Sequence, residues 1–196
     1  MNALLRRRDV VKALLEKREN LLVVAGLGST AWDCTAAGDS PLTFPMWGAM
    51  GNAAMLGLGL ALAQPARRVL VVTGDGEMLM GLGSLATIGV QKPTNLAVVV
   101  IDNERYGETG MQATHTADGV NLAKIALACG FEAGVQVRSA PELAALCGTI
   151  HSGRGPLLAQ IKVSPEKLPL VLPPRDGALL KTRFRRALLG EGADLD

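Results

Sequence analysis

Aromatic residues are scarce in this chain of 196 residues, where Phe, Tyr and Trp together make up 3% of the sequence. The interior must therefore be built from aliphatic and small residues, which bring the hydrophobic fraction to 48%. A core of Ala, Val, Leu and Gly is typical of buried parallel strands with helices packed closely on both faces. The length is sufficient for one domain with a substantial core.

Cysteine is also rare, and the three cysteines are Cys34, Cys129 and Cys147. Their number is odd and their spacing does not match a zinc site or an iron–sulfur cluster. Both features argue against a disulfide framework and favour reduced thiols, so we expect a cytoplasmic protein.

The chain lacks an excess of charge of one sign, since its formal net charge is +2. This value argues against nucleic-acid binding. Arginines gather near both ends, as Arg6 to Arg8 and as Arg183, Arg185 and Arg186. At helical spacing such clusters predict solvated helix faces, with a docking surface as the alternative.

No uninterrupted apolar run is long enough for a secretory signal or a membrane span. Charges at residues 6–9 and at Lys12 interrupt the start of the chain. Residues 48–63 are apolar, but this stretch is short, rich in Gly and Ala, and ends at Gln64-Pro65. It predicts a buried helix, and we expect no association with a membrane.

Helical and extended patterns alternate along the chain. This alternation predicts an α/β fold: a doubly wound parallel sheet with helices on both faces. We expect a single domain over 1–196, with a C-terminal helical tail from about residue 176. Ligands of such sheets bind beyond the carboxyl ends of the strands. Helices are predicted over residues 2–18, 49–63, 78–88, 122–129, 141–152 and 178–189, and strands over 21–25, 68–73, 96–101, 131–137 and 157–163.

Polar residues follow the second and third predicted strands directly. Gly74-Asp75-Gly76-Glu77 ends one strand, and Asn103 follows the next. A carboxylate and an amide oxygen are hard ligands that suit Mg²⁺ or Ca²⁺ together with phosphate oxygens. The glycines let the backbone approach a phosphate, and the helix that follows would direct its first amides at that anion. An ordinary turn is the alternative interpretation.

This Gly-Asp-Gly motif with a spaced Asn resembles the motif of thiamin-diphosphate-dependent enzymes. The resemblance implies that Asp75, Asn103 and the backbone carbonyl of Arg105 hold Mg²⁺, which binds the cofactor's diphosphate. It also implies that residues around these ligands contact the cofactor, namely Gly74, Gly76, Glu77, Tyr106 and Gly107.

Residues 47–51, Trp-Gly-Ala-Met-Gly, resemble the decarboxylase and acetolactate-synthase branch of this family. The resemblance implies that Met50 props the two cofactor rings into a bent shape and that the Gly48 carbonyl accepts a hydrogen bond from the 4′-amino group. A simple core methionine is the alternative. After the first strand, Gly28, Ser29 and Thr30 are implied to contact the diphosphate, or else form a turn with Ser29 as a helix N-cap.

The glutamate that activates the cofactor in this family has no convincing counterpart, because Glu16 and Glu19 lie on a charged amphipathic helix. The resemblance therefore implies a partner subunit with a pyrimidine-binding domain, in a hetero-oligomer such as α2β2 or larger. The chain is similar over nearly its whole length to the sulfopyruvate and phosphonopyruvate decarboxylase group. Two departures are Glu77 and Glu108, where that group often has small residues.

The expected activity is decarboxylation of a small 2-oxo acid. An acidic group at Glu108 near the substrate would disfavour a sulfonate or phosphonate. His115 is a candidate proton shuttle near neutral pH, and a surface histidine is the alternative. Two other functions remain open: an acetolactate-synthase-like carboligase subunit and a non-catalytic, cofactor-binding regulatory subunit. A nicotinamide-binding module is disfavoured because Gly26 and Gly28 are not followed by the third glycine of that motif.

Overall fold

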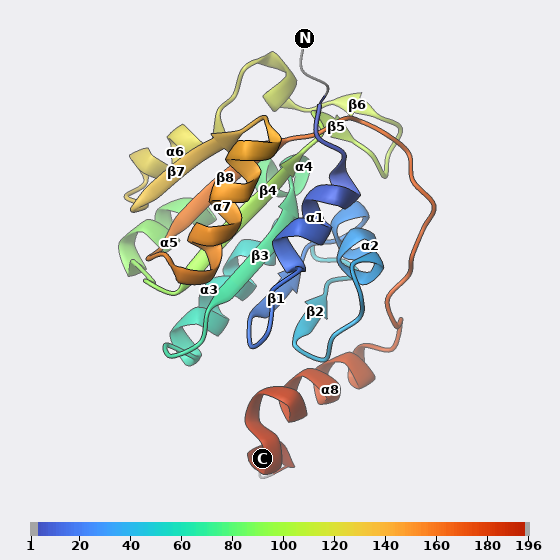
Figure 1. Cartoon of the computed structure of the whole chain (residues 1–196), viewed down its shortest axis with the longest axis vertical. Helices are drawn as coiled ribbons and strands as arrows, with labels where there is room; N and C mark the ends of the chain where they lie inside the picture. Colours follow the sequence, from blue (N-terminus) through green and yellow to red (C-terminus); the bar gives the residue numbers. More distant parts are fainter. Residues whose placement is uncertain (1–3, 195–196) are drawn as a thin grey trace.

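A six-stranded parallel sheet forms the centre of the molecule in the computed structural model, which describes residues 4–194 (Figure 1). The strand order is β2-β1-β3-β4-β8-β7. Every pairing is parallel, so the predicted α/β doubly wound class is confirmed. The strands are β1 (Leu22–Ala25), β2 (Thr43–Pro45), β3 (Val69–Gly74), β4 (Leu96–Asp102), β7 (Ala133–Val137) and β8 (Leu157–Lys162).

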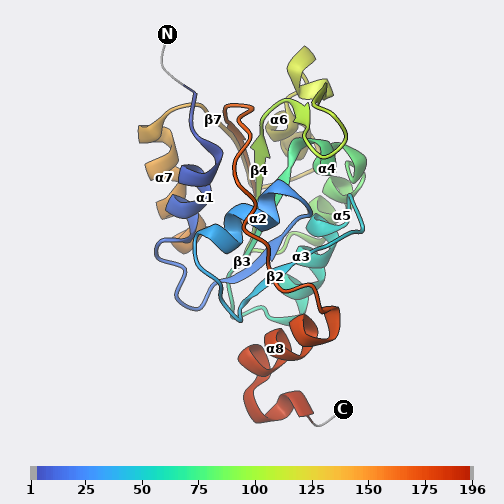
Figure 2. The ribbon, with the colours of Figure 1, turned by 90° about the vertical axis from the view of Figure 1, so that its right-hand side faces the viewer.

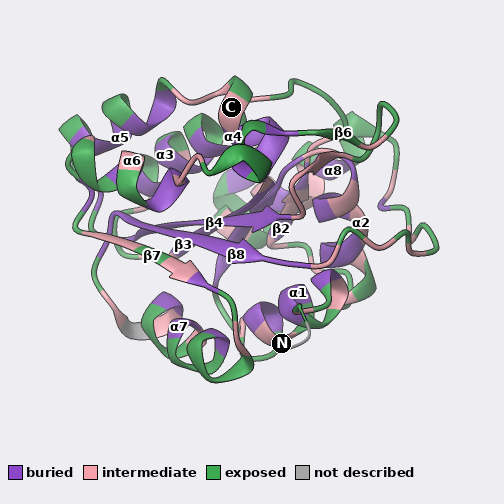
Figure 3. Cartoon of the chain, turned by 90° about the horizontal axis from the view of Figure 1, so that it is seen from above, coloured by how far each residue is buried: buried purple, intermediate pink, exposed green. Residues whose placement is uncertain are grey.

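Helices cover both faces of the sheet, which makes three layers (Figure 2). Successive strand residues alternate between the faces: Val23 packs in one core cluster and Val24 in the other. The helices are buried toward the sheet and exposed outside (Figure 3). The first face carries α1 (Arg7–Leu15), α2 (Ser29–Ala36) and α7 (Ala140–Ser152), and the second carries α3 (Ala53–Ala63), α4 (Asp75–Met80), α5 (Ser84–Gln91) and α6 (Leu122–Ala128).

Several predicted boundaries are wrong, and glycine or backbone geometry explains two of them. The single helix expected over 78–88 is two helices, α4 and α5, separated by the Gly81–Gly83 segment. The helix expected from residue 49 begins at Ala53, because Ala49 and Gly51 have positive φ angles of 58° and 89°. The first helix is shorter than the predicted 2–18, part of which lies outside the described residues.

Four short elements were not predicted: α2, β2, the hairpin of β5 (Arg105–Tyr106) with β6 (Gln112–Ala113), and the 3₁₀ turn η1 (His115–Asp118). Each has eight residues or fewer, too few for a periodic pattern to emerge. The hairpin and η1 lie between β4 and α6, so they extend from the carboxyl edge of the sheet.

The two central strands end in register. Gly74 of β3 pairs with Ile101 of β4, so Asp75 and Asp102 follow side by side at the carboxyl edge. The C-terminal helix α8 (Gly177–Leu189) and the turn η2 (Gly190–Asp194) lie at the opposite end of the molecule (Figure 1). There Phe184 meets Phe44 edge to face at 5.8 Å between ring centroids. Within residues 4–194 we find no helix with the length and apolar character needed to cross a membrane.

Two glycines of α3 should respond in opposite ways to alanine. A Cβ on Gly57 would lie 2.2 Å from Cγ2 of Val71, whereas a Cβ on Gly59 has nothing within 4 Å. Gly57→Ala should therefore destabilise the chain by about 1–3 kcal/mol through overpacking. Gly59→Ala should stabilise it by about 0.5–1 kcal/mol through helix propensity. Urea unfolding of both variants measures this, and equal effects would show that α3 does not pack closely on β3.

Candidate functional site

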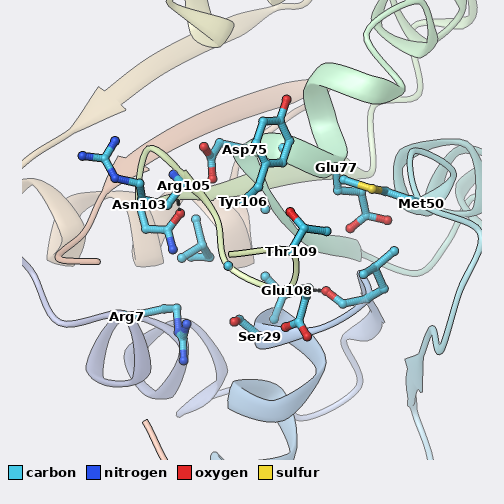
Figure 4. A pocket seen from close by; sticks show the side chains of 16 residues that line it. Arg7, Ser29, Met50, Asp75, Glu77, Asn103, Arg105, Tyr106, Glu108 and Thr109 are labelled. Atoms are coloured by element: carbon cyan, nitrogen blue, oxygen red, sulfur yellow. Dashed lines mark hydrogen bonds between the residues drawn. The ribbon is translucent and has the colours of Figure 1, made fainter. Parts of the chain in front are cut away.

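A pocket lies beyond the carboxyl ends of β1, β3 and β4 (Figure 4). Its volume is about 110 Å³. It gathers residues that are far apart in the sequence, including most of those predicted for the cofactor and the metal. The lining residues are Arg7, Leu27, Ser29, Thr30, Met50, Gly74, Asp75, Gly76, Glu77, Ile101, Asn103, Arg105, Tyr106, Gly107, Glu108 and Thr109.

Asp75 is a buried carboxylate at the first residue of α4. Its Oδ2 accepts hydrogen bonds from the hydroxyls of Thr114 and, at 3.3 Å, of Thr116. Burial raises the pKa of Asp75 to about 6, the Thr114 hydrogen bond opposes this rise, and the charge of Asp102 adds to it. A carboxylate in this position is stabilised by any cation that reaches it.

The neighbouring carboxylate of Asp102 has its cation within the protein. Lys162 Nζ lies 2.7 Å from Oδ2 of Asp102 and 2.6 Å from Oε1 of Glu104. Gln160 donates to the same Oδ2 at 2.6 Å and Thr116 donates to Oδ1 at 2.7 Å. Lys162 thus neutralises Asp102, and among the described residues no ion pair does the same for Asp75.

Asn103 and Arg105 form a tight turn after β4. The backbone N–H of Arg105 donates to Oδ1 of Asn103 at 3.0 Å, and Glu104 between them has a positive φ of 61°. The β5–β6 hairpin then brings the chain back, so that Thr114 and Thr116 reach the carboxylates. The local backbone strain at Glu104 is typical of a functional turn.

This donor set suits a hard divalent cation such as Mg²⁺. Asp75 and Asn103 supply a carboxylate and an amide oxygen on one pocket wall, and Arg105 lines the same pocket. Over residues 4–194 we find no cluster of three His, Cys, Asp or Glu side chains that could hold a metal alone. A cation here would therefore need oxygens from a ligand or water, as Mg²⁺ commonly does.

Met50 enters the pocket from a strained loop. The positive φ angles of Ala49 and Gly51 set its direction, and a Cβ on Gly81 would lie 2.1 Å from the Gly51 carbonyl oxygen. Met50 remains 36% exposed and lies across the pocket from Asn103 (Figure 4). Gly48 is exposed in the same loop and does not line the pocket.

Glu77 is a buried residue of the pocket wall. Its Oε2 accepts a hydrogen bond from Thr73 at 2.8 Å, and a Cβ on Gly26 would lie 2.0 Å from that oxygen. Burial raises the pKa of Glu77, opposed by the Thr73 hydroxyl and then by the backbone amides of Gly51, Ala53 and Leu27. Glu77 thus lies between the end of β1 and the Met50 loop, and its Oε1 has no hydrogen-bond partner among the described residues.

The loop after β1 leads into α2, which starts at Ser29. The N-cap is Gly28, with φ 70° and no side-chain cap, so the alternative of Ser29 as N-cap is wrong. Ser29 and Thr30 line the pocket but Gly28 does not. The Thr30 hydroxyl donates to the Gly26 carbonyl at 2.7 Å, which leaves its backbone rather than its hydroxyl proton for a ligand.

A second hollow adjoins the first and shares Met50, Gly76, Tyr106 and Thr109 with it. His115 lines this hollow and not the first pocket. Its other lining residues are Leu79, Met80, Leu82, Val120 and Ile125, so the wall is mostly apolar. Tyr106 packs against Gly76, where a Cβ would lie 2.5 Å from the ring.

Thr114, Thr116 and Arg7 are polar residues of the site that were not predicted. Thr114 and Thr116 bind the carboxylates, but nothing in a polar loop sequence indicates that. Arg7 was expected on a solvated face and is buried in the pocket wall instead, so that prediction is wrong for Arg7. In the sequence, only the run of three arginines from Arg6 to Arg8 sets Arg7 apart from other charged helix residues.

Residues 28–161 match the family model described as thiamine pyrophosphate enzyme, C-terminal TPP binding domain. The chain belongs to this family. The match spans both strand ends that carry Asp75 and Asn103, and it begins at the loop that precedes α2.

Named relatives of this thiamine pyrophosphate enzyme chain agree with that assignment. It is 35% identical to the sulfopyruvate decarboxylase subunit beta of Methanothermobacter thermautotrophicus over 97% of this chain and 100% of the relative. It is 39% identical to the phosphonopyruvate decarboxylase of Streptomyces viridochromogenes over 80% of this chain and 39% of the relative. The crystal structure of a Mycobacterium smegmatis protein described as thiamin diphosphate-dependent has the same fold, with TM-score 0.71 and 23% identity over 84% of this chain and 32% of that one.

Proposed function

We propose that the chain is the diphosphate-binding subunit of a thiamin-diphosphate- and Mg²⁺-dependent enzyme that decarboxylates a 2-oxo acid. The observation that carries the proposal is the convergence of the Asp75 carboxylate and the Asn103 amide on one pocket, beside a strained loop that presents Met50. Asp75, Asn103 and the Arg105 carbonyl would hold the metal. When bound, the cofactor would supply the electron sink that makes loss of CO₂ from a 2-oxo acid possible.

The residues of this chain would bind and orient rather than react. Gly74, Gly76 and the first amides of α4 would face the diphosphate, and Ser29, Thr30, Tyr106 and Gly107 would complete that wall. Met50 would support the rings on the opposite side, since an unbranched thioether adapts to an irregular gap. Glu77 would position the Met50 loop, and Gly48 and Gly28 lie just outside the pocket for backbone contacts.

A partner subunit is part of the proposal. The pocket of about 110 Å³ is well below the roughly 300–1,000 Å³ of a typical ligand site. Met50, Glu108 and Thr109 are exposed at its rim, so a second wall has room to form there. We therefore propose a cytoplasmic hetero-oligomer, α2β2 or larger, in which residues 1–196 form one diphosphate-binding domain with a helical tail from about 176. The partner would supply the activating glutamate.

The substrate would enter through the hollow that His115 lines, and His115 would exchange protons there. Glu108 lines the first pocket but not this hollow, and its carboxylate lies close to Gly28. The acidic group is therefore on the diphosphate side, and it does not argue against an anionic substrate. The relatives named for sulfopyruvate and phosphonopyruvate favour substrates of that kind.

Assays of the chain with and without its partner test this proposal. Release of CO₂ from sulfopyruvate, phosphonopyruvate and pyruvate should require both subunits. Met50→Ala should lower kcat about 10- to 100-fold, because the rings would lose their orientation, whereas Met50→Leu should retain most of the rate. A carbon–carbon coupled product from pyruvate would favour the carboligase alternative. Cofactor binding without turnover of any 2-oxo acid would favour the regulatory alternative.

A further inference from the structure

Arg7 differs from its two neighbours in where its side chain lies. The Arg7 side chain is only 7% exposed, against 63% for Arg6 and 26% for Arg8. A fully charged guanidinium is rarely buried unless it is paired or binds a ligand. Groups near the Arg7 guanidinium should therefore balance its positive charge and accept hydrogen bonds from its N–H donors.

Asp33 balances only part of the charge of Arg7 and accepts from only part of its N–H donors. Arg7 Nε donates to Oδ2 of Asp33, and Arg8 Nε donates to Oδ1 of the same carboxylate at 3.0 Å. One carboxylate thus serves two guanidiniums, which leaves one positive charge in excess. Arg8 also donates from Nη2 to the Pro169 carbonyl at 2.8 Å. Within residues 4–194 the Arg7 guanidinium has only its Nε bond, so four of its five N–H donors remain unused.

Arg7 lines one end of the pocket, beside the start of α2. Arg7, Ser29 and Asn103 occupy that end, and Met50 and Glu77 the other (Figure 4). The eight-residue helix α2 begins there with no side-chain cap on its first amides. The Ser29 hydroxyl also has no hydrogen bond among the described residues. A helix start, a free hydroxyl and a buried arginine together are suited to a phosphate group.

The position of Glu108 also supports a phosphate site at the start of α2. Its Oε1 lies 2.6 Å from where a Gly28 Cβ would be, at the start of α2. A carboxylate from an exposed loop thus rests where we place an anion. A bound phosphate would have to displace it.

We infer that Arg7 binds the terminal phosphate of the diphosphate directly, through its two terminal amino groups, while Asp33 holds the guanidinium in place. The inference rests on the proposed function, since it takes thiamin diphosphate as the ligand of this pocket. It adds a phosphate ligand from the N-terminal helix, 68 positions before Asp75, and it makes α1 part of the cofactor site.

Calorimetric titration of the full chain in complex with its partner subunit, with thiamin diphosphate and with inorganic pyrophosphate, each with Mg²⁺, tests the role of Arg7. Arg7→Gln should weaken the binding of both ligands about tenfold or more, because charge-assisted hydrogen bonds are lost. Arg8→Gln is the matched control, since Arg8 shares Asp33 but does not line the pocket, and it should change affinity less than about threefold. Glu108→Gln should strengthen binding.

Arg7→Lys separates binding from folding. Lysine keeps the ion pair with Asp33 but has no second nitrogen for a phosphate, so its thermal midpoint should stay near that of the unmodified chain while its affinity falls as for Arg7→Gln. Equal affinity losses in the Arg7→Gln and Arg8→Gln variants, or unchanged affinity in Arg7→Lys, would overturn the inference alone. Binding of pyrophosphate through Arg7 without binding of thiamin diphosphate would overturn the proposed function and leave the phosphate site standing. Binding of neither ligand would overturn both.

Discussion

Asp75→Asn is expected to abolish most Mg²⁺-dependent binding of thiamin diphosphate and at the same time to stabilise the metal-free chain at neutral pH. Removing the charge of a buried ion ligand costs about 3 kcal/mol, which is roughly 100-fold in affinity. Isothermal titration with and without Mg²⁺ measures this loss. Asp118→Asn, at an exposed acid in η1, is the control and should bind normally.

The stabilising effect of Asp75→Asn follows from the raised pKa of Asp75, about 6 against an ordinary value of 3.8. The folded metal-free chain binds this proton more tightly than the unfolded chain does. The resulting stability is therefore full below pH 4 and is lost as pH rises through 6. Asparagine stays neutral, so the variant should be more stable by about 1–3 kcal/mol at pH 8 and equal near pH 4. Unchanged cofactor affinity, or a variant less stable than the original at pH 8, would contradict this interpretation.

Lys162→Met should produce the largest loss of stability. Methionine keeps an unbranched apolar side chain, one heavy atom shorter than lysine, but leaves the Asp102 carboxylate buried without its cation. Breaking one side of a buried ion pair costs about 3–5 kcal/mol, which is a large share of the roughly 5–15 kcal/mol that stabilises a domain. Urea unfolding at pH 7.5 gives the free energy of unfolding. A loss below about 1 kcal/mol would mean that Asp102 does not depend on Lys162.

A double variant separates charge from packing. Lys162→Met with Asp102→Asn removes both charges, so it should recover a large part of the stability lost in Lys162→Met alone. Lys167→Met, at an exposed lysine five positions later, should stay within about 0.5 kcal/mol of the unmodified chain. Failure of the double variant to recover would point to packing around Lys162 rather than to charge.

The sheet was predictable because burial on both faces requires nearly continuous apolar strands. Residues 69–73 and 96–101 are almost entirely aliphatic, and polar residues follow each strand at once. Parallel register then brings Asp75 and Asn103 to the same edge, as their positions after the two strands implied. The motif and the strand pattern therefore point independently to the same edge of the sheet.

The short elements were not predictable, and the errors at the site follow from them. Arg7 is buried because Asp33 meets it from α2, a helix whose eight residues give no clear periodic signal. Without α2, nothing distinguishes Arg7 from the exposed Arg6. Thr114 and Thr116 are similar cases, since only the unpredicted β5–β6 hairpin returns them to the carboxylates.

The conformation of the Met50 loop was not predictable for a different reason. The apolar stretch 48–63 indicated one helix, but the positive φ angles of Ala49 and Gly51 keep residues 47–52 out of it. The resemblance to the decarboxylase branch identified Met50, whereas helical periodicity alone would have placed it in the core. Backbone strain of this kind is set by tertiary contacts such as that of Gly51 with Gly81, and those contacts are not visible in a sequence.

Anomalous diffraction at the manganese edge, from crystals grown with Mn²⁺ and thiamin diphosphate, tests the central claim most directly. We expect one manganese ion at bonding distance from the Asp75 carboxylate, the Asn103 amide oxygen and the Arg105 carbonyl, and in contact with the diphosphate. A bound cofactor whose metal lies elsewhere, with Asp75 and Asn103 directed to separate places, would contradict it.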